Sequence, residues 1–206
     1  TLEAPPGRIV LARAFPRTPE AVAAAAGQAS APEDGVELGS RVRDGRLEWD
    51  APAGRWDVLL ITEDRLYAGT HAEGNLWSKM PYINLLQREP TARFIELTYA
   101  RYAERLVPDL GRLFDATFTD EPSLMSLFLR RMPYRPLPWA PELPAEFARR
   151  RGYALEPILP HLAADLGPDT PRHRHDFWLT VGELVAENFF GQIQTWCQAH
   201  RIPSGG

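Results

Sequence analysis

The pattern of apolar and polar residues predicts a central parallel strand from Phe114 to Thr119. Apolar and polar residues alternate there, and Phe and Thr suit a pleated backbone. The strand stops at two adjacent acids, Asp120 and Glu121, because Pro122 cannot donate to a sheet ladder and biases the residue before it towards an extended or turn conformation. Catalytic and ligand-binding residues collect at such strand ends in α/β sheets and barrels. The alternative interpretation is a solvated turn with two ordinary acids.

Helical periodicity flanks this strand. Between Pro90 and Pro108, one face of a predicted helix carries Ile95, Tyr99, Tyr102 and Leu106. A further helix is predicted to begin with the segment Trp139–Leu143, with Leu143 and Phe147 on one side and Gly152 as the residue that ends it. The most regular helix is predicted from Asp176 to His200, with a buried face made of Trp178, Val181, Val185, Phe189, Ile193 and Trp196.

The first part of the chain predicts a small antiparallel β unit. A buried strand is expected from Arg8 to Ala14, ended by Pro16, and Glu20 to Ala26 is compatible with a short helix. Leu47 and Trp49 alternate with polar neighbours, turn residues follow from Asp50 to Gly54, and Trp56, Val58 and Leu60 alternate again, a pattern that predicts a hairpin.

Long irregular segments in compact domains often carry function. His71 and Trp77 lie in such a segment and are candidates for ligand contacts, with a plain loop as the alternative. His173 and His175 are expected in a polar linker, where two histidines without a third ligand are weak evidence for a metal.

Together these elements predict an α/β fold with part of a (β/α)8 barrel and a small antiparallel β insertion. Residues 1–80 are expected to hold the first strand, the insertion and the loop, and residues 81–206 the barrel portion, truncated at its C-terminal end. The chain has no charged-then-apolar leader and ends at Gly206, where a new element should begin. We therefore expect a piece of a longer protein.

Composition narrows the function classes. The net charge of −4 over 206 residues, with Lys79 as the only lysine, gives no support to nucleic-acid binding. Cys197 is the only cysteine, which excludes an internal disulfide, and its helical apolar setting predicts a buried, inert thiol. No apolar run is long enough to span a membrane.

Four blocks, in order and spacing, resemble the family 106 glycoside hydrolases, the α-L-rhamnosidase-like enzymes, and related large bacterial glycosidases. The blocks are Tyr82–Leu86 with Arg93–Thr98 and Tyr102; Phe118–Pro122; Trp139, Phe147 and Arg151–Tyr153 with Leu159–Pro160; and Asp176–Trp178 through Trp196–Cys197 to Ile202–Gly205. The resemblance covers about residues 36 to 206. It implies a (β/α)8 catalytic barrel in a secreted or periplasmic multidomain enzyme that acts on plant or microbial polysaccharide.

The resemblance also implies inverting hydrolysis by two carboxylates. It allows calcium as an assisting ion and specifies no cofactor with certainty. It places a catalytic or sugar-binding acid at Glu121. Adjacent Asp120 and Glu121 should not form the catalytic pair, since neighbours on a strand point to opposite faces. We expect Glu121 to be the general acid and Asp120 its hydrogen-bond partner, with the second catalytic carboxylate beyond Gly206. The candidates for sugar contacts are Trp77, His71, Asn84, Tyr134 and Trp139. The aromatic ones would stack on a sugar ring, and core packing is their alternative.

Two other functions stay open. Without a second carboxylate, the chain would be a non-catalytic carbohydrate-binding or scaffolding piece. A hydrolase acting on another type of bond is a third hypothesis, but no Gly-x-Ser-x-Gly motif or metal-binding His pair supports it.

Overall fold

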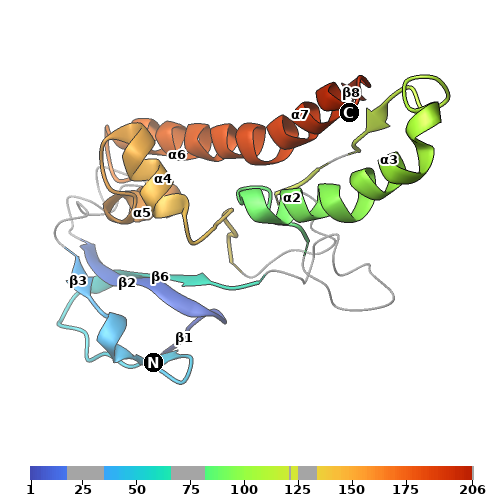
Figure 1. Ribbon diagram of the computed structural model, residues 1–206. Helices are drawn as coiled ribbons and strands as arrows, with labels where there is room; N and C mark the ends of the chain where they lie inside the picture. Colours follow the sequence, from blue (N-terminus) through green and yellow to red (C-terminus); the bar gives the residue numbers. More distant parts are fainter. Residues whose placement is uncertain (18–34, 66–81, 121, 125–133, 206) are drawn as a thin grey trace. The chain divides into compact units, whose positions relative to one another are not determined.

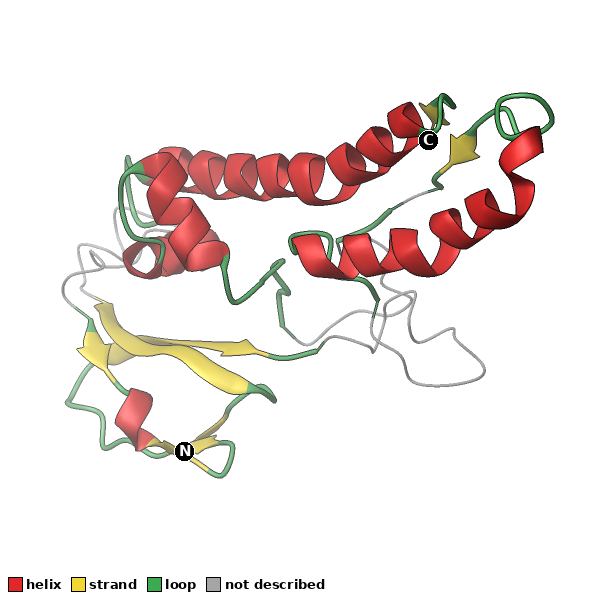
Figure 2. Cartoon of the chain, in the orientation of Figure 1, coloured by secondary structure: helices red, strands yellow, loops and turns green. Residues whose placement is uncertain are grey.

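A computed structural model describes residues 1–17, 35–65, 82–120, 122–124 and 134–205 (Figure 1). The chain divides into two compact units. Unit 1 comprises Thr1–Leu66, Pro133–Arg135 and Pro144–Trp178, and unit 2 comprises Tyr67–Met132, Pro136–Leu143 and Leu179–Gly206. Figure 2 shows that strands gather in the first part of unit 1, and that helices make up most of the rest of the described chain.

Two small antiparallel sheets form the first part of unit 1. In one sheet, β2 (Arg8–Arg17) lies between β3 (Val36–Glu37) and β6 (Arg55–Glu63). In the other, β5 (Arg46–Leu47) lies between β1 (Leu2–Glu3) and β4 (Val42–Arg43), and a 3-10 turn, η2 (Gly39–Arg41), precedes β4. Ala12, Ala14, Leu38 and Leu47 are buried in one core, against which Trp49, Trp56, Val58 and Leu60 pack.

These sheets confirm an antiparallel β unit but correct the predicted hairpin. Leu47 pairs with Leu2 and Val42, whereas β6 pairs with β2, so the two supposed arms of the hairpin belong to different sheets. The turn residues between them separate two strands without making them partners. The first strand also continues through Pro16, which lies opposite Trp56 near the end of the ladder, a position where proline is tolerated.

Helices complete unit 1. α4 (Leu143–Arg151) is followed by η6 (Glu156–Ile158) and α5 (Leu159–Ala163). Leu143 and Phe147 are 0% exposed, as the sequence predicts. Gly152 ends α4 at a φ of 83°, a left-handed conformation that favours glycine, and its N–H donates to the Ala148 carbonyl at 2.9 Å.

The long C-terminal helix consists of α6 (Thr170–Val185), a π-helical turn η7 (Ala186–Phe190) and α7 (Gly191–Ala199). It begins earlier than predicted, so His173 and His175 lie in helix and not in a linker. Pro171 occupies the first turn, where a backbone N–H would have no partner within the helix. The Thr170 hydroxyl accepts a hydrogen bond from the Leu166 N–H at 2.9 Å.

The buried face of this helix differs from the predicted one. Trp178 is 47% exposed, while its neighbour Phe177 is 0% exposed. Val181 and Leu184 are buried as well. The next buried residue is Phe189, five residues after Leu184, and the π-helical turn lies within this interval. The extra residue shifts the apolar register, and the buried face after the turn then contains Phe189, Ile193 and Cys197.

A second helix in unit 2 contains a similar interruption. It consists of α2 (Arg88–Ile95), a π-helical turn η4 (Glu96–Ala100), α3 (Arg101–Leu106) and a 3-10 turn η5 (Val107–Asp109). Pro90 lies in its first turn, as predicted, but Tyr102 is 65% exposed and Ala103 is buried in its place. α2 packs beside η7 and α7 (Figure 1). The core between them includes Leu85, Phe189, Ile193, Cys197 and Ile202, with Ile95 and Tyr99 packed against it.

A short parallel pair of strands closes unit 2. β7 (Thr117–Phe118) pairs with β8 (Ser204–Gly205), with Thr117 opposite Ser204 and Phe118 opposite Gly205. This confirms a parallel strand before the two acids, but not its predicted length or burial: Phe114 is 46% and Phe118 73% exposed. The strand starts late because Asp109–Phe114 forms a turn, in which the Phe114 N–H donates to the Asp109 carbonyl at 3.0 Å.

The described residues contain this parallel pair and not a recognisable portion of a barrel. Among them, no helix combines the length and apolar character needed to cross a membrane.

Candidate active site

The candidate site is centred on the carboxyl end of β7. The Thr117 N–H donates to the Pro203 carbonyl at 3.1 Å, and the Thr119 N–H donates to the Gly205 carbonyl at 2.9 Å. The ladder therefore holds the backbone up to the residue before Asp120, whose side chain is exposed. The arrangement places a solvent-accessible carboxylate where a parallel strand ends, the edge at which α/β sheets bind ligands.

Helix α7 contacts β7 through a pair of side chains. The Cys197 Sγ lies 3.2 Å from the Thr117 Oγ1, within hydrogen-bonding distance, and Cys197 is 1% exposed. The buried thiol agrees with the structural role predicted for it. α7 leads into β8, but α4, α5 and α6 also lie between β7 and β8 in the sequence, so several helices connect the two parallel strands.

Tyr82 is a residue of this site that the sequence reasoning did not select. The Ser123 N–H donates a long hydrogen bond, 3.4 Å, to the Tyr82 Oη. Ser123 is buried and follows the acidic turn, whereas Tyr82 is 40% exposed. An accessible aromatic ring is thus tied to the backbone just beyond Asp120. In the sequence, Tyr82 stands out only as the first residue of the block Tyr82–Leu86. No sequence pattern predicts that this block contacts Ser123.

Asn84 is engaged inside the protein. Its Nδ2 donates to the Trp139 carbonyl at 3.0 Å, and its Oδ1 accepts the Leu86 N–H at 3.1 Å. These bonds hold the loop before α2 in a fixed turn and join it to the segment before α4. The structure therefore assigns Asn84 a role in shaping the loop; its predicted contact with sugar stays a prediction.

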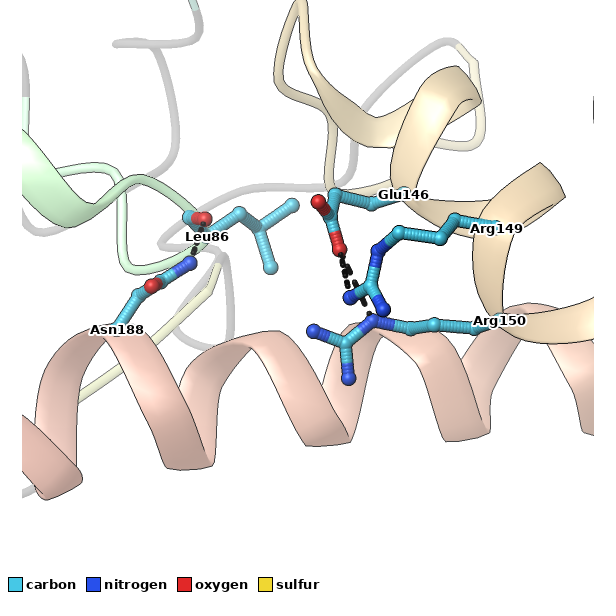
Figure 3. Close-up of polar contacts among 5 residues, drawn as sticks. All are labelled: Leu86, Glu146, Arg149, Arg150 and Asn188. Atoms are coloured by element: carbon cyan, nitrogen blue, oxygen red, sulfur yellow. Dashed lines mark hydrogen bonds and ion pairs between the residues drawn. The ribbon is translucent and has the colours of Figure 1, made fainter.

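The same loop is held to the long helix. The Asn188 Nδ2 donates to the Leu86 carbonyl at 2.6 Å, as Figure 3 shows, and the Gln192 Nε2 donates to the Arg88 carbonyl at 3.0 Å. Leu86 itself is 4% exposed. Two side-chain amides thus satisfy backbone carbonyls at the start of α2, where the chain has just passed Tyr82 and Asn84.

The other predicted site residues are not brought together by the described structure. Trp139 lies in unit 2, half-buried, and no described residue offers its buried indole N–H a hydrogen bond. Tyr134 belongs to unit 1 and is 36% exposed. Glu121, His71 and Trp77 lie outside the described residues.

Two titratable groups with shifted pKa values lie in or next to α4 in unit 1. A hydrogen bond from Arg149, with a further one from Arg150, lowers the pKa of Glu146 (Figure 3). Burial and a 2.5 Å hydrogen bond to Asp176 raise the pKa of Tyr153 to about 12. These contacts are typical of helix packing and surface pairing.

Among the described residues, no three His, Cys, Asp or Glu side chains are grouped closely enough to hold an ion. The described residues therefore offer no cluster of carboxylates for the calcium that the family resemblance allows.

Comparison with known proteins identifies the family. Residues 15–204 match the sequence profile of glycoside hydrolase family 106, described as alpha-L-rhamnosidase. A protein of Formosa agariphila, provisionally named a beta-glucuronidase, is 25% identical over 171 residues, which are 81% of this chain and 14% of the relative.

The solved structure of a rhamnosidase from Novosphingobium sp. PP1Y has a similar fold. It matches 87% of this chain and 17% of its own, with a TM-score of 0.54 and 21% identity. The chain thus spans about a seventh of the length of the first relative and about a sixth of the second. Because the family profile covers nearly the whole chain, the chain belongs to glycoside hydrolase family 106, the alpha-L-rhamnosidase family.

Proposed function

We propose that the chain is part of the catalytic domain of a glycosidase that hydrolyses plant or microbial polysaccharide, with α-L-rhamnosides as substrates. One observation carries the proposal: in a chain of this family, the parallel pair β7–β8 lies just before the exposed Asp120, and helix α7 leads into its second strand. Catalytic carboxylates collect at such strand ends. The activity belongs to a longer protein, in keeping with the small share of each relative that the chain spans.

A (β/α)8 barrel is the proposed setting of the site. Parallel sheets are covered on both faces in known folds, and two strands alone are marginally stable at best. Phe118, the last residue of β7, is 73% exposed. Further strands of the longer protein would extend the sheet, and helices would cover the exposed Phe118.

The proposed chemistry uses two carboxylates on opposite sides of the glycosidic bond. Glu121 protonates the leaving oxygen, and a base outside this chain activates water. In an inverting enzyme the two carboxyl groups lie about 6.5–9.5 Å apart, which leaves room for the water. Asp120 orients Glu121 or accepts a hydrogen bond from a sugar hydroxyl. Trp77, His71, Asn84, Tyr134 and Trp139 remain proposed contacts to the sugar.

The two relatives carry names that refer to different sugars, a rhamnoside and a glucuronide. Rhamnose is neutral, whereas glucuronate carries a carboxylate that a binding site must neutralise, usually with Arg or Lys. The family profile favours the rhamnoside.

The experiment is to incubate the full-length protein with aryl α-L-rhamnoside and aryl β-D-glucuronide and to measure aryl alcohol release. Faster hydrolysis of the rhamnoside is the expected result. Turnover of the glucuronide alone would move the proposal to that sugar. Binding of oligosaccharide without turnover of any glycoside would instead establish the carbohydrate-binding alternative.

A further inference from the structure

We propose that Tyr82 is part of the carbohydrate-binding surface beside β7, with its ring lying against a pyranose ring of the substrate. The inference rests on the proposed glycosidase function and adds a residue to its site. It starts from the hydrogen bond of 3.4 Å between the Ser123 N–H and the Tyr82 Oη.

This bond limits how far Tyr82 can lie from the acidic turn. Ser123 is three residues from Asp120, and three residues of extended chain span at most about 11 Å. The Tyr82 hydroxyl is therefore within reach of an oligosaccharide that contacts Asp120.

The ring is both accessible and held in place. Tyr82 is 40% exposed although its hydroxyl contacts the buried Ser123. The next residue, Ile83, packs against the core of unit 2, and Asn84 and Leu86 are bound to Trp139 and Asn188. A loop fixed at these points presents the ring with little conformational freedom, which lowers the entropy cost of binding.

The chemistry of the surface suits a carbohydrate. A tyrosine ring offers a flat apolar face of the kind that packs on the C–H face of a pyranose, with a polar hydroxyl at its edge. The nearby carboxylate of Asp120 accepts hydrogen bonds, and sugar hydroxyls donate them. An apolar face next to a strong acceptor matches a pyranose, which has apolar faces and a rim of hydroxyls.

The first test compares Tyr82 variants of the full-length enzyme on the glycoside that it hydrolyses fastest. Tyr82→Leu is expected to raise KM about tenfold, with kcat and the melting temperature little changed. Tyr82→Phe and Tyr82→Trp, which keep an aromatic face, should hold KM near the wild-type value. The matched control is Tyr102→Leu, which removes a 65% exposed tyrosine from α3 and should leave KM unchanged. Equal KM values for Tyr82→Leu and the wild type would overturn the inference.

The second test uses the wild-type protein and does not depend on turnover. Tetranitromethane nitrates accessible tyrosines, and peptide mass spectrometry locates the nitro groups. Saturating rhamnose-containing oligosaccharide should slow nitration of Tyr82 and leave Tyr102 unaffected. Equal nitration of Tyr82 with and without the sugar would refute the contact. An active enzyme with unprotected Tyr82 would refute this inference alone, whereas a protein that neither binds nor cleaves glycosides would refute the proposed function as well.

Discussion

Replacing Asn188 by alanine should loosen the loop that carries Tyr82 and Asn84. The amide of Asn188 donates to the Leu86 carbonyl at 2.6 Å (Figure 3), and Leu86 is 4% exposed, so water cannot easily replace the lost donor. A buried acceptor left without its partner costs about 1–3 kcal/mol. Alanine is a better helix former than asparagine by at most about 0.7 kcal/mol, so the loss of the hydrogen bond outweighs the gain.

Hydrogen exchange in the full-length protein measures this effect locally. A loss of about 1–3 kcal/mol in the free energy of local opening corresponds to exchange about 5- to 150-fold faster. The increase should be confined to peptides that contain Asn84 to Arg88. Gln198→Ala, at an exposed position of α7, is the matched control and should leave these peptides unchanged. Unchanged protection of the Leu86 amide in Asn188→Ala would show that the hydrogen bond does not hold the loop.

Two further predictions concern the part of α6 that belongs to unit 1. Burial, together with the Arg172 guanidinium, lowers the pKa of His173. Between that lowered pKa and the ordinary value of about 6.5, the folded state binds fewer protons than the unfolded state. The free energy of unfolding should therefore fall as pH drops through this window. His173→Gln should reduce the slope of stability against pH there, and an unchanged slope would contradict the assignment. Phe177→Ala should destabilise the protein by about 3–5 kcal/mol, because Phe177 is 0% exposed. Trp178→Ala, at a 47% exposed position, should cost much less in chemical denaturation, and equal losses for the two variants would contradict the observed helix face.

Sequence patterns predicted the helices well and their faces less well. The periodicity around Val181, Phe189 and Ile193 correctly indicated one long helix. It placed Trp178 inside because a constant period of 3.6 residues cannot account for the π-helical turn Ala186–Phe190. Tyr102 was predicted on the buried face for the same reason, because the π-helical turn Glu96–Ala100 precedes it. No local signal in the sequence marks a π-helical turn, because tertiary packing decides where the extra residue is accommodated.

Strand partners were harder to predict than strands. Alternation at Trp56, Val58 and Leu60 correctly indicated a strand, but its partner β2 lies far away in the sequence, and a turn motif reports only on adjacent segments. The parallel strand before Asp120 was predicted because Pro122 and the alternation gave a clear local signal. Tyr82 was missed as a site residue because its contact with Ser123 joins distant segments.

The most direct test of the central claim measures how the effect of Glu121→Gln depends on the leaving group. In the full-length enzyme, kcat/KM is determined for a natural-type rhamnoside and for an activated aryl rhamnoside. If Glu121 is the general acid, the variant should lose about 10²–10⁴-fold on the natural-type substrate and much less on the aryl one, whose leaving group barely needs protonation. Asp120→Asn, the matched control, should weaken both substrates alike. Equal losses for Glu121→Gln on the two substrates, or near-normal activity on both, would contradict the assignment of Glu121 as the general acid.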